Sequence, residues 1–129
     1  MYYVLDTHII VWFLEGGSKL GTKSKEILKS EDTLLIIPSI TLAEIKHLNL
    51  SGRININLEE VITTLESDPR CTIYPLDLSV IENLPKTLDI HDGIICATAI
   101  VYRDILQEKV CLLTKDEAII KSNLVETIF

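Results

Sequence analysis

Four carboxylates lie at or just beyond the ends of apolar segments in this sequence: Asp6, Glu44, Asp92 and Asp116. Asp6 and Asp116 come shortly after runs that are typical of buried strands, whereas Glu44 and Asp92 lie early in segments that read as helices. Because the strands of an open parallel sheet direct their carboxyl ends toward a ligand crevice, we expect the four side chains to reach one crevice. Carboxylates without histidine or thiolate partners are ligands of hard cations. The sequence therefore predicts a divalent-cation site.

Other kinds of active site are poorly supported by the sequence. It contains no GxSxG elbow, no GxxxxGK[ST] phosphate loop and no GxGxxG turn. A nucleophilic pair of His91 and Cys96 is excluded because five residues along a helix place two side chains roughly 140° apart. A phosphoacceptor pocket of the receiver type would need paired acids after the first strand, but Thr7 and His8 follow Asp6. An acidic metal site remains, in which a bound cation can activate water and neutralise charge in a transition state.

The elements that must position these residues alternate along the chain. Apolar periodicity and stop residues predict strands at 2–5, 34–37, 71–74, 110–113 and 125–128 and helices at 8–15, 22–31, 39–50, 58–67, 78–84, 92–106 and 116–122. Ser39 and Asn57 are predicted N-caps. This alternation predicts a three-layer α/β/α fold whose central sheet is mainly parallel. Residues 1–129 are expected to form a single domain.

Composition narrows the classes of function. Nineteen acidic and 12 basic residues give a net charge of −7, which counts against a plain nucleic-acid-binding module. The longest uncharged apolar run, 94–102, is far shorter than the about 20 residues of a membrane span, so we expect a soluble cytoplasmic protein without a membrane partner. Three cysteines without zinc-ligand spacing fit a reducing compartment. Lys46 and Arg53, on or beyond the predicted helix of Glu44, are weak candidates for substrate binding.

Four segments in order resemble the motifs of the PIN domain family, specifically its small VapC-like toxins of prokaryotic toxin–antitoxin pairs. These segments are Val4-Leu5-Asp6-Thr7-His8, Ser39-Ile40-Thr41-Leu42-Ala43-Glu44-Ile45, His91-Asp92-Gly93-Ile94-Ile95-Cys96-Ala97-Thr98-Ala99 and Leu112-Leu113-Thr114-Lys115-Asp116. An Asp after a strand is common, so no single segment is specific, but four in order across this length are. The departures are modest: Gly93 stands where many relatives carry Arg or Ala, and His8 where Asn or Ser is often found.

The resemblance implies an activity and partners for this chain. It implies a PIN-like fold and a metal-dependent endoribonuclease that hydrolyses phosphodiester bonds in RNA with Mg²⁺ or Mn²⁺. RNA rather than DNA is implied by the resemblance alone. A cognate antitoxin would inhibit the enzyme by occupying the cleft, and the family leads us to expect a homodimer. The alternative function is that of a non-catalytic PIN-like interaction or scaffold protein that has kept its acids.

Each residue of the predicted site has an expected role. Asp6 and Asp92 are expected to be direct metal ligands, and Asp116 a direct or water-mediated ligand. Glu44 is expected to be a ligand or to orient the attacking water. Two threonines are expected to donate hydrogen bonds that fix the carboxylates: Thr7 and Thr114.

Ordinary structural explanations for the same residues stay open at this point. Asp92 and Asp116 are also suited to N-cap their helices, and Glu44 is suited to a solvent-facing helical position. Asp89, three residues before Asp92, competes with it for the third acidic position, although the spacing of the third segment favours Asp92. No role is assigned to His8. Asp6 is harder to explain in structural terms alone, because it lies at the end of a buried strand, where burying an unpaired charge costs free energy.

Overall fold

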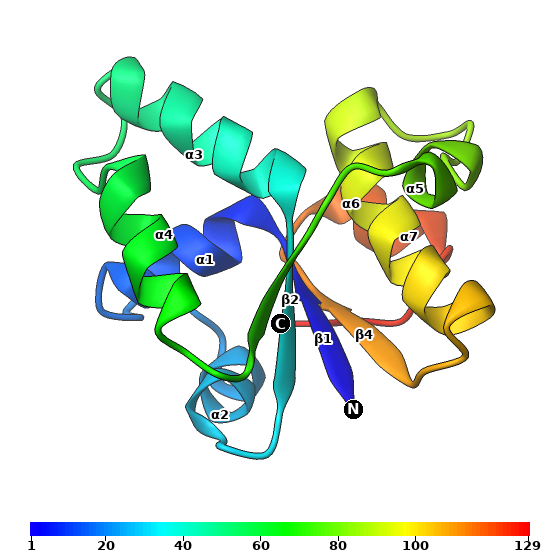
Figure 1. Cartoon of the computed structure of the whole chain (residues 1–129), viewed down its shortest axis with the longest axis horizontal. Helices are drawn as coiled ribbons and strands as arrows, with labels where there is room; N and C mark the ends of the chain where they lie inside the picture. Colours follow the sequence, from blue (N-terminus) through cyan, green and yellow to red (C-terminus); the bar gives the residue numbers. More distant parts are fainter.

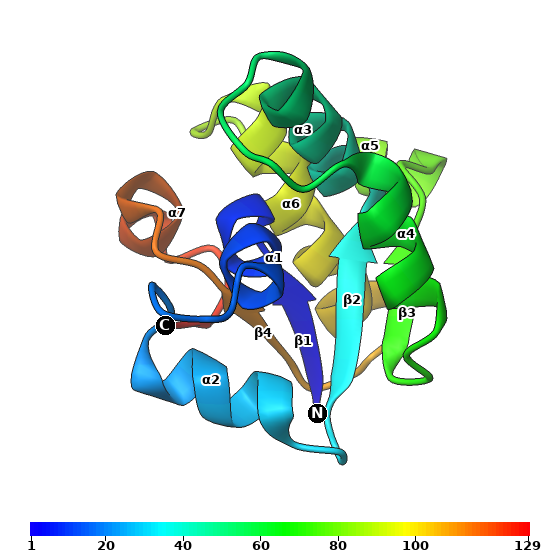
Figure 2. The same cartoon turned by 90° about the vertical axis from the view of Figure 1, so that its left-hand side faces the viewer.

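A single five-stranded sheet organises the chain, with all strands parallel and in the order β3-β2-β1-β4-β5 (Figures 1 and 2). The computed structural model describes residues 1–129, and its strands are β1 (Tyr2–Leu5), β2 (Leu34–Pro38), β3 (Cys71–Tyr74), β4 (Val110–Leu113) and β5 (Thr127–Ile128). β1 and β4 are neighbours although more than a hundred residues separate them, with Leu5 opposite Leu113. Their carboxyl ends therefore lie side by side.

Helices cover both faces of the sheet, as the sequence predicts. They are α1 (Thr7–Leu14), α2 (Thr22–Lys29), α3 (Ser39–Leu50), α4 (Leu58–Glu66), α5 (Leu78–Glu82), α6 (Ile90–Ile100) and α7 (Glu117–Ser122), and a π-helical turn, η1 (Val101–Ile105), extends α6. Figure 1 shows α1, α2 and α4 on one side of the sheet and α5, α6 and α7 on the other. The three-layer α/β/α prediction is confirmed. None of the helices combines the length and apolarity that a membrane crossing requires.

Alternation along the strands divides the core into two layers. Leu5, Leu35 and Leu113 pack toward α1, whereas the preceding or following residues of the same strands, such as Val4 and Leu112, pack toward α6. Successive side chains of a strand point to opposite faces, so a strand that is covered on both faces must be apolar throughout. This is why the strands read as continuous apolar runs and why only residues beyond their ends can be charged.

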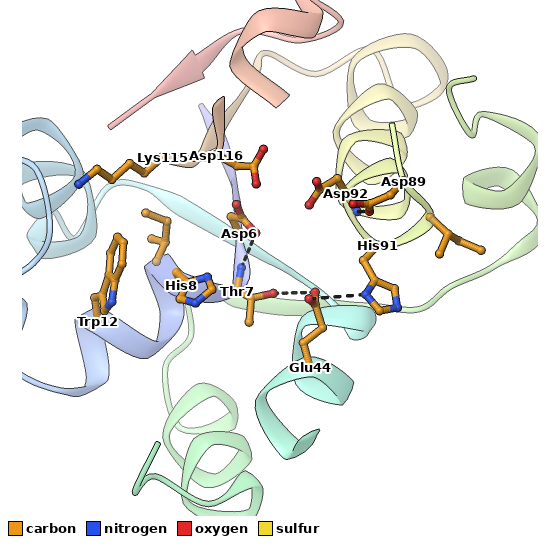
Figure 3. Close-up of a pocket in the computed structure, with 12 residues that line it drawn as sticks. Asp6, Thr7, His8, Trp12, Glu44, Asp89, His91, Asp92, Lys115 and Asp116 are labelled. Atoms are coloured by element: carbon orange, nitrogen blue, oxygen red, sulfur yellow. Dashed lines mark hydrogen bonds and ion pairs between the residues drawn. The ribbon is translucent and has the colours of Figure 1, made fainter. Parts of the chain in front are cut away.

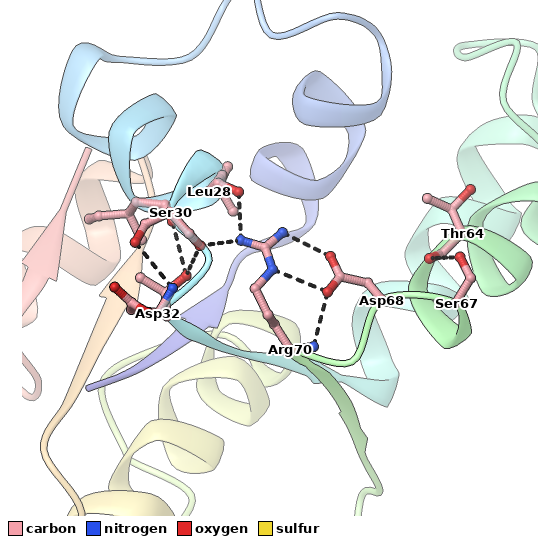
Figure 4. A network of polar contacts seen from close by, with 9 residues as sticks. Leu28, Ser30, Asp32, Thr64, Ser67, Asp68 and Arg70 are labelled. Atoms are coloured by element: carbon pink, nitrogen blue, oxygen red, sulfur yellow. Dashed lines mark hydrogen bonds and ion pairs between the residues drawn. The ribbon is translucent and has the colours of Figure 1, made fainter.

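A polar network fixes the end of α2 against the start of β3 (Figure 4). The guanidinium of Arg70 donates to the carbonyls of Leu28 and Ser30 at 2.8 and 2.6 Å and also to both carboxylate oxygens of Asp68. The ion pair with Asp68 holds the pKa of that carboxyl below its ordinary value. These bonds satisfy carbonyls that the end of a helix leaves without partners.

Several predicted boundaries are wrong, and α6 is the most informative case. The helix starts at Ile90 rather than residue 92, because the carboxylate of Asp89 is its N-cap and accepts from the backbone N–H of Asp92 at 3.1 Å. Asp92 is therefore not a cap. The α-helix ends at Ile100 and continues as η1, rather than running regularly to residue 106.

Three other predictions about caps and ends differ in outcome. Asn57 is the N-cap of α4, as predicted, and accepts from the N–H of Glu60. Ser39 is not the N-cap of α3: Pro38 occupies that position, and the Ser39 hydroxyl instead accepts from the N–H of Leu76 at 3.1 Å. The last strand is shorter than predicted, starting only at Thr127.

Candidate active site

A pocket of about 770 Å³ opens at the carboxyl ends of β1 and β4 (Figure 3). All four predicted carboxylates line it: Asp6, Glu44, Asp92 and Asp116. They come from the end of β1, the first half of α3, the first turn of α6 and the start of α7. The expected convergence of these side chains on one pocket is therefore present in the structure.

Asp6 is the most buried of the four acids and both of its carboxylate oxygens are engaged. Its Oδ1 accepts from the N–H of Thr7 at 2.7 Å, where Asp6 is the N-cap of α1, and its Oδ2 accepts from the Thr114 hydroxyl at 2.6 Å. Burial raises the pKa of Asp6 above its ordinary value, the two hydrogen bonds oppose that rise, and the charge of Asp116 adds to it. The carboxylate is thus held in one orientation toward the pocket.

Thr114 joins the ends of β1 and β4. Its fully buried hydroxyl donates to Asp6 and at the same time accepts from the N–H of Asp116 at 3.0 Å. Asp116 is the N-cap of α7, where its Oδ1 accepts from the N–H of Ile119 at 3.1 Å. Since the cap uses one oxygen, Asp116 still presents the other to the pocket.

Glu44 is oriented in the pocket by a hydrogen bond from Thr7 and lies near His91. The Thr7 hydroxyl donates to its Oε1 at 2.8 Å, and the Nδ1 atom of His91 lies 3.8 Å from its Oε2. The second distance is too long for a hydrogen bond and is an ion pair only when His91 is protonated. Glu44 is half-buried, so it is not the solvent-facing helical residue that the sequence also allowed.

Asp92 has no structural partner of its own. Its carboxylate makes no hydrogen bond within the protein, since Asp89 provides the cap of α6. Partial burial raises the pKa of Asp92 to about 6, and the charges of Asp116, Asp89, Asp6 and Glu44 contribute to the rise. Both causes act in the same direction, because burial and nearby like charges each disfavour the ionised form of a carboxyl group.

The ligand atoms of the pocket are of the kind that a hard divalent cation prefers, but the spacing of the side chains fits such a cation less well. The four predicted acids offer only oxygen atoms, as Mg²⁺ and Mn²⁺ prefer. However, no three acidic, histidine or cysteine side chains are placed to hold one ion in this structure. No hydrogen bond fixes the carboxylate of Asp92 in its present position.

The predicted basic residues do not reach this pocket. Lys46 lies two residues after Glu44 on α3, about 200° around the helix, and lines a separate depression beside Asn57 and Leu58. Arg53 is exposed beyond the end of α3. Their contact with a substrate stays a prediction.

The pocket also contains residues to which the sequence assigned no role there. Trp12 and Lys115 line it, together with His8 and His91. His8 and Trp12 are four residues apart and so share one face of α1, but their spacing does not show that this face borders the pocket. Lys115 lies between two residues of the predicted site, Thr114 and Asp116, at the end of β4.

Comparisons with known proteins agree with this architecture. The sequence pattern of the PIN domain family matches residues 3–122. No curated protein matches the chain. Similar solved structures include VapBC2 from Rickettsia felis bound to a DNA fragment from their promoter, with 16% identity over 99% of this chain and 98% of that chain at a TM-score of 0.71.

Two further structures show the same likeness. VapBC-1 from nontypeable Haemophilus influenzae is 18% identical over 99% of this chain and 97% of that chain, with a TM-score of 0.66. FitAcB from Neisseria gonorrhoeae is 24% identical over 98% and 96%, with a TM-score of 0.59. At these identities the likeness concerns the fold. Since the family pattern spans nearly the whole sequence and the fold agrees with it, this chain belongs to the PIN domain family.

Proposed function

We propose that this protein is a VapC-like toxin, a metal-dependent endoribonuclease that hydrolyses phosphodiester bonds in RNA. Membership of the PIN domain family supports a nuclease-type function. The observation that carries the proposal is the meeting of four carboxylates from separate elements in one pocket, where burial first and then the neighbouring negative charges raise the pKa of Asp92 to about 6. Such crowding is costly in a folded protein unless a cation or a proton relieves it.

The pocket residues have distinct proposed roles. A bound Mg²⁺ or Mn²⁺ would supply charge neutralisation and an activated water. Asp6 and Asp92 would hold the cation directly and Asp116 directly or through water, while Glu44 would be a ligand or orient the attacking water. Two hydroxyl groups support these roles, because they fix Asp6 and Glu44 in the pocket: those of Thr114 and Thr7.

We propose the partners of this chain from its membership of the PIN domain family and from the structures that it resembles. The matched structures are described as VapBC or toxin–antitoxin complexes, which supports a cognate antitoxin as the cellular inhibitor. We also propose a homodimer in the cytoplasm, formed by residues 1–129 as one PIN domain. Light scattering on the purified chain, alone and after co-expression with the product of a neighbouring gene, would measure both associations.

A second candidate is a non-catalytic PIN protein that only binds partners. It is favoured by the absence of any three potential ligands placed to hold one ion. A catalytic site would have to bring Asp92 and Asp116 closer to Asp6 when the cation binds. The two candidates therefore differ first in whether Mn²⁺ binds at all.

Cleavage of single-stranded RNA by purified protein in Mn²⁺ tests the proposal. Asp6→Asn and Asp92→Asn should each abolish turnover, because each removes a ligand charge while conserving shape. Glu82→Gln is a matched control, since Glu82 is an exposed acid on α5 outside the pocket. Turnover that survives in both pocket variants would show that the activity comes from elsewhere. If calorimetry detects no binding of Mn²⁺ and no RNA is cleaved, the non-catalytic candidate is favoured.

A further inference from the structure

The pocket has two chemically different walls. In Figure 3, His8, Trp12 and Lys115 lie on the side opposite Asp89 and Asp92. The side with Asp89 and Asp92, which we call the acidic wall, suits a cation, whereas the side with the aromatic rings and the lysine has no part in holding one. We call the set of His8, Trp12 and Lys115 the aromatic wall.

The Trp12 ring of this wall packs against the core and is in contact with the His8 ring. The ring centroids of His8 and Trp12 are 5.6 Å apart and their planes are tilted by 47°. Trp12 also packs on the core, and its centroid lies 6.1 Å from that of Phe129 in an edge-to-face arrangement. His8 is exposed and Trp12 is partly exposed, and both line the pocket. The indole is thus a rigid platform with open surface toward the pocket.

Lys115 supplies the only positive charge of lysine or arginine type in the pocket. Its ammonium lies 5.4 Å from the centroid of the Phe129 ring and forms no ion pair, although Asp116 follows it in the sequence. The ammonium group points away from the carboxylates, toward the side of Trp12 (Figure 3). An exposed, unpaired cation beside aromatic rings is suited to an anionic group attached to a flat, uncharged one.

We infer that the aromatic wall binds one nucleobase of a single-stranded RNA, which stacks on Trp12 and His8 while an adjacent phosphate pairs with Lys115. This inference rests on the proposed function and names a substrate contact within it. Bases stack on aromatic side chains irrespective of sequence, because every base has a π-face. In a duplex the base faces are already stacked, so the wall selects unpaired strands.

The wall also resolves an electrostatic difficulty. A run of phosphates crossing the acidic wall is repelled at short range, whereas a neutral base is not. Anchoring a base and one phosphate at the aromatic wall positions the next phosphodiester over the carboxylates. The strand would then enter past His8 and Trp12 and be cut at the acidic wall.

A protein side chain is a poorer occupant of the same wall. An arginine would suit both the indole and the carboxylates, but Lys115 repels a cation that approaches the aromatic wall. A nucleotide supplies the flat face and the negative charge together. An arginine-rich peptide is therefore the appropriate competitor in a binding test.

Trp12 is the only tryptophan of the chain, so its fluorescence reports directly on this wall. A short single-stranded RNA should quench it in EDTA at about 150 mM salt, where charge repulsion is screened beyond about 8 Å. An abasic ribose-phosphate oligomer of equal length and the same RNA in a duplex should leave it unchanged. His8→Ala should weaken RNA binding by about tenfold, and Lys115→Gln should lower the salt dependence by about one phosphate contact.

Controls separate this inference from the nuclease proposal. Trp12→Phe keeps a ring and should keep most of the affinity, measured by anisotropy of a labelled RNA, whereas Trp12→Leu should not; thermal melting checks that both fold. Equal quenching by the abasic oligomer, unchanged affinity of His8→Ala, or quenching by the arginine-rich peptide alone would overturn the inference. Because EDTA prevents metal binding, base binding without any later cleavage refutes only the nuclease, and cleavage without base-dependent quenching refutes only the aromatic wall.

Discussion

Asp92→Asn should make the metal-free protein more stable, which is unusual for a change in a pocket. The side chain of Asp92 makes no hydrogen bond that Asn would lose, and the cap of α6 is provided by Asp89. What Asn removes is a charge that burial and the neighbouring carboxylates disfavour, with Asp116 first among those neighbours. The prediction therefore isolates the electrostatic cost of the pocket.

The size of the gain follows from the pKa. A rise from 3.8 to about 6 corresponds to about 3 kcal/mol at 1.36 kcal/mol per pKa unit. Asp92 is only partly buried, so solvent screening reduces this to roughly half. Its charge in the first turn of α6 also interacts favourably with the helix dipole by about 0.3–1 kcal/mol, which Asn forfeits. We expect a net gain of about 1 kcal/mol, or roughly 3–5 °C in Tm.

The direction in which stability changes with pH follows from the raised pKa of Asp92. The folded-state pKa of Asp92 lies above its unfolded value, so the folded protein binds the extra proton, and stability falls as pH rises from about 4 through about 6. Denaturant unfolding in EDTA should show the full gain of Asp92→Asn at about pH 7.5 and little gain at about pH 4.5. Glu82→Gln should show neither. A variant less stable than wild type at the higher pH, or an equal gain at both, would refute the reasoning.

Three further outcomes are expected. Millimolar Mn²⁺ or Mg²⁺ should raise the Tm of the wild type, by an amount equivalent to about 2.7 kcal/mol at 100 times the Kd, and an unchanged Tm with no calorimetric binding favours the non-catalytic candidate. Thr114→Val should cost about 1–3 kcal/mol of unfolding free energy, because the buried Asp6 carboxylate loses a donor, and Thr114→Ser should restore most of it. Lys46→Glu and Arg53→Glu should weaken RNA binding more than Lys23→Glu, an exposed control on α2, if the sequence-based substrate prediction is right; equal losses in salt titrations would mean general charge repulsion.

The fold is largely predictable from this sequence because burial on both faces leaves a strong signal. β1 and β4 are apolar at every position, and their predicted bounds agree with the structure. The capping Asn57 likewise identifies the start of α4 from local chemistry. The sequence does not show which of several possible hydrogen-bonding partners a polar side chain takes. Ser39 is an example, because its hydroxyl bonds to the loop before α5 instead of capping α3.

Only some of the residues that line the pocket could be predicted from the sequence. Residues that follow parallel strands must meet at one edge of the sheet, so topology alone brings Asp6 and Asp116 together. The direction of a side chain on a helix depends on its rotation about the helix axis. Lys46 therefore turns away from the pocket although it is only two residues from Glu44. The local sequence of α1 does not show that its exposed face, with His8 and Trp12, borders the pocket.

Helix capping and chemistry are not competing explanations for the acids of this pocket. Asp116 caps α7 with one oxygen and keeps the other available, and Asp6 caps α1 while facing the carboxylates opposite. Either residue would be explained by local structure alone. Asp92 would not, because Asp89 has already capped α6 and nothing in the protein pairs with it. The unpaired carboxylate of Asp92, with a pKa raised by burial and by its acidic neighbours, is therefore the observation on which its proposed role as a cation ligand rests.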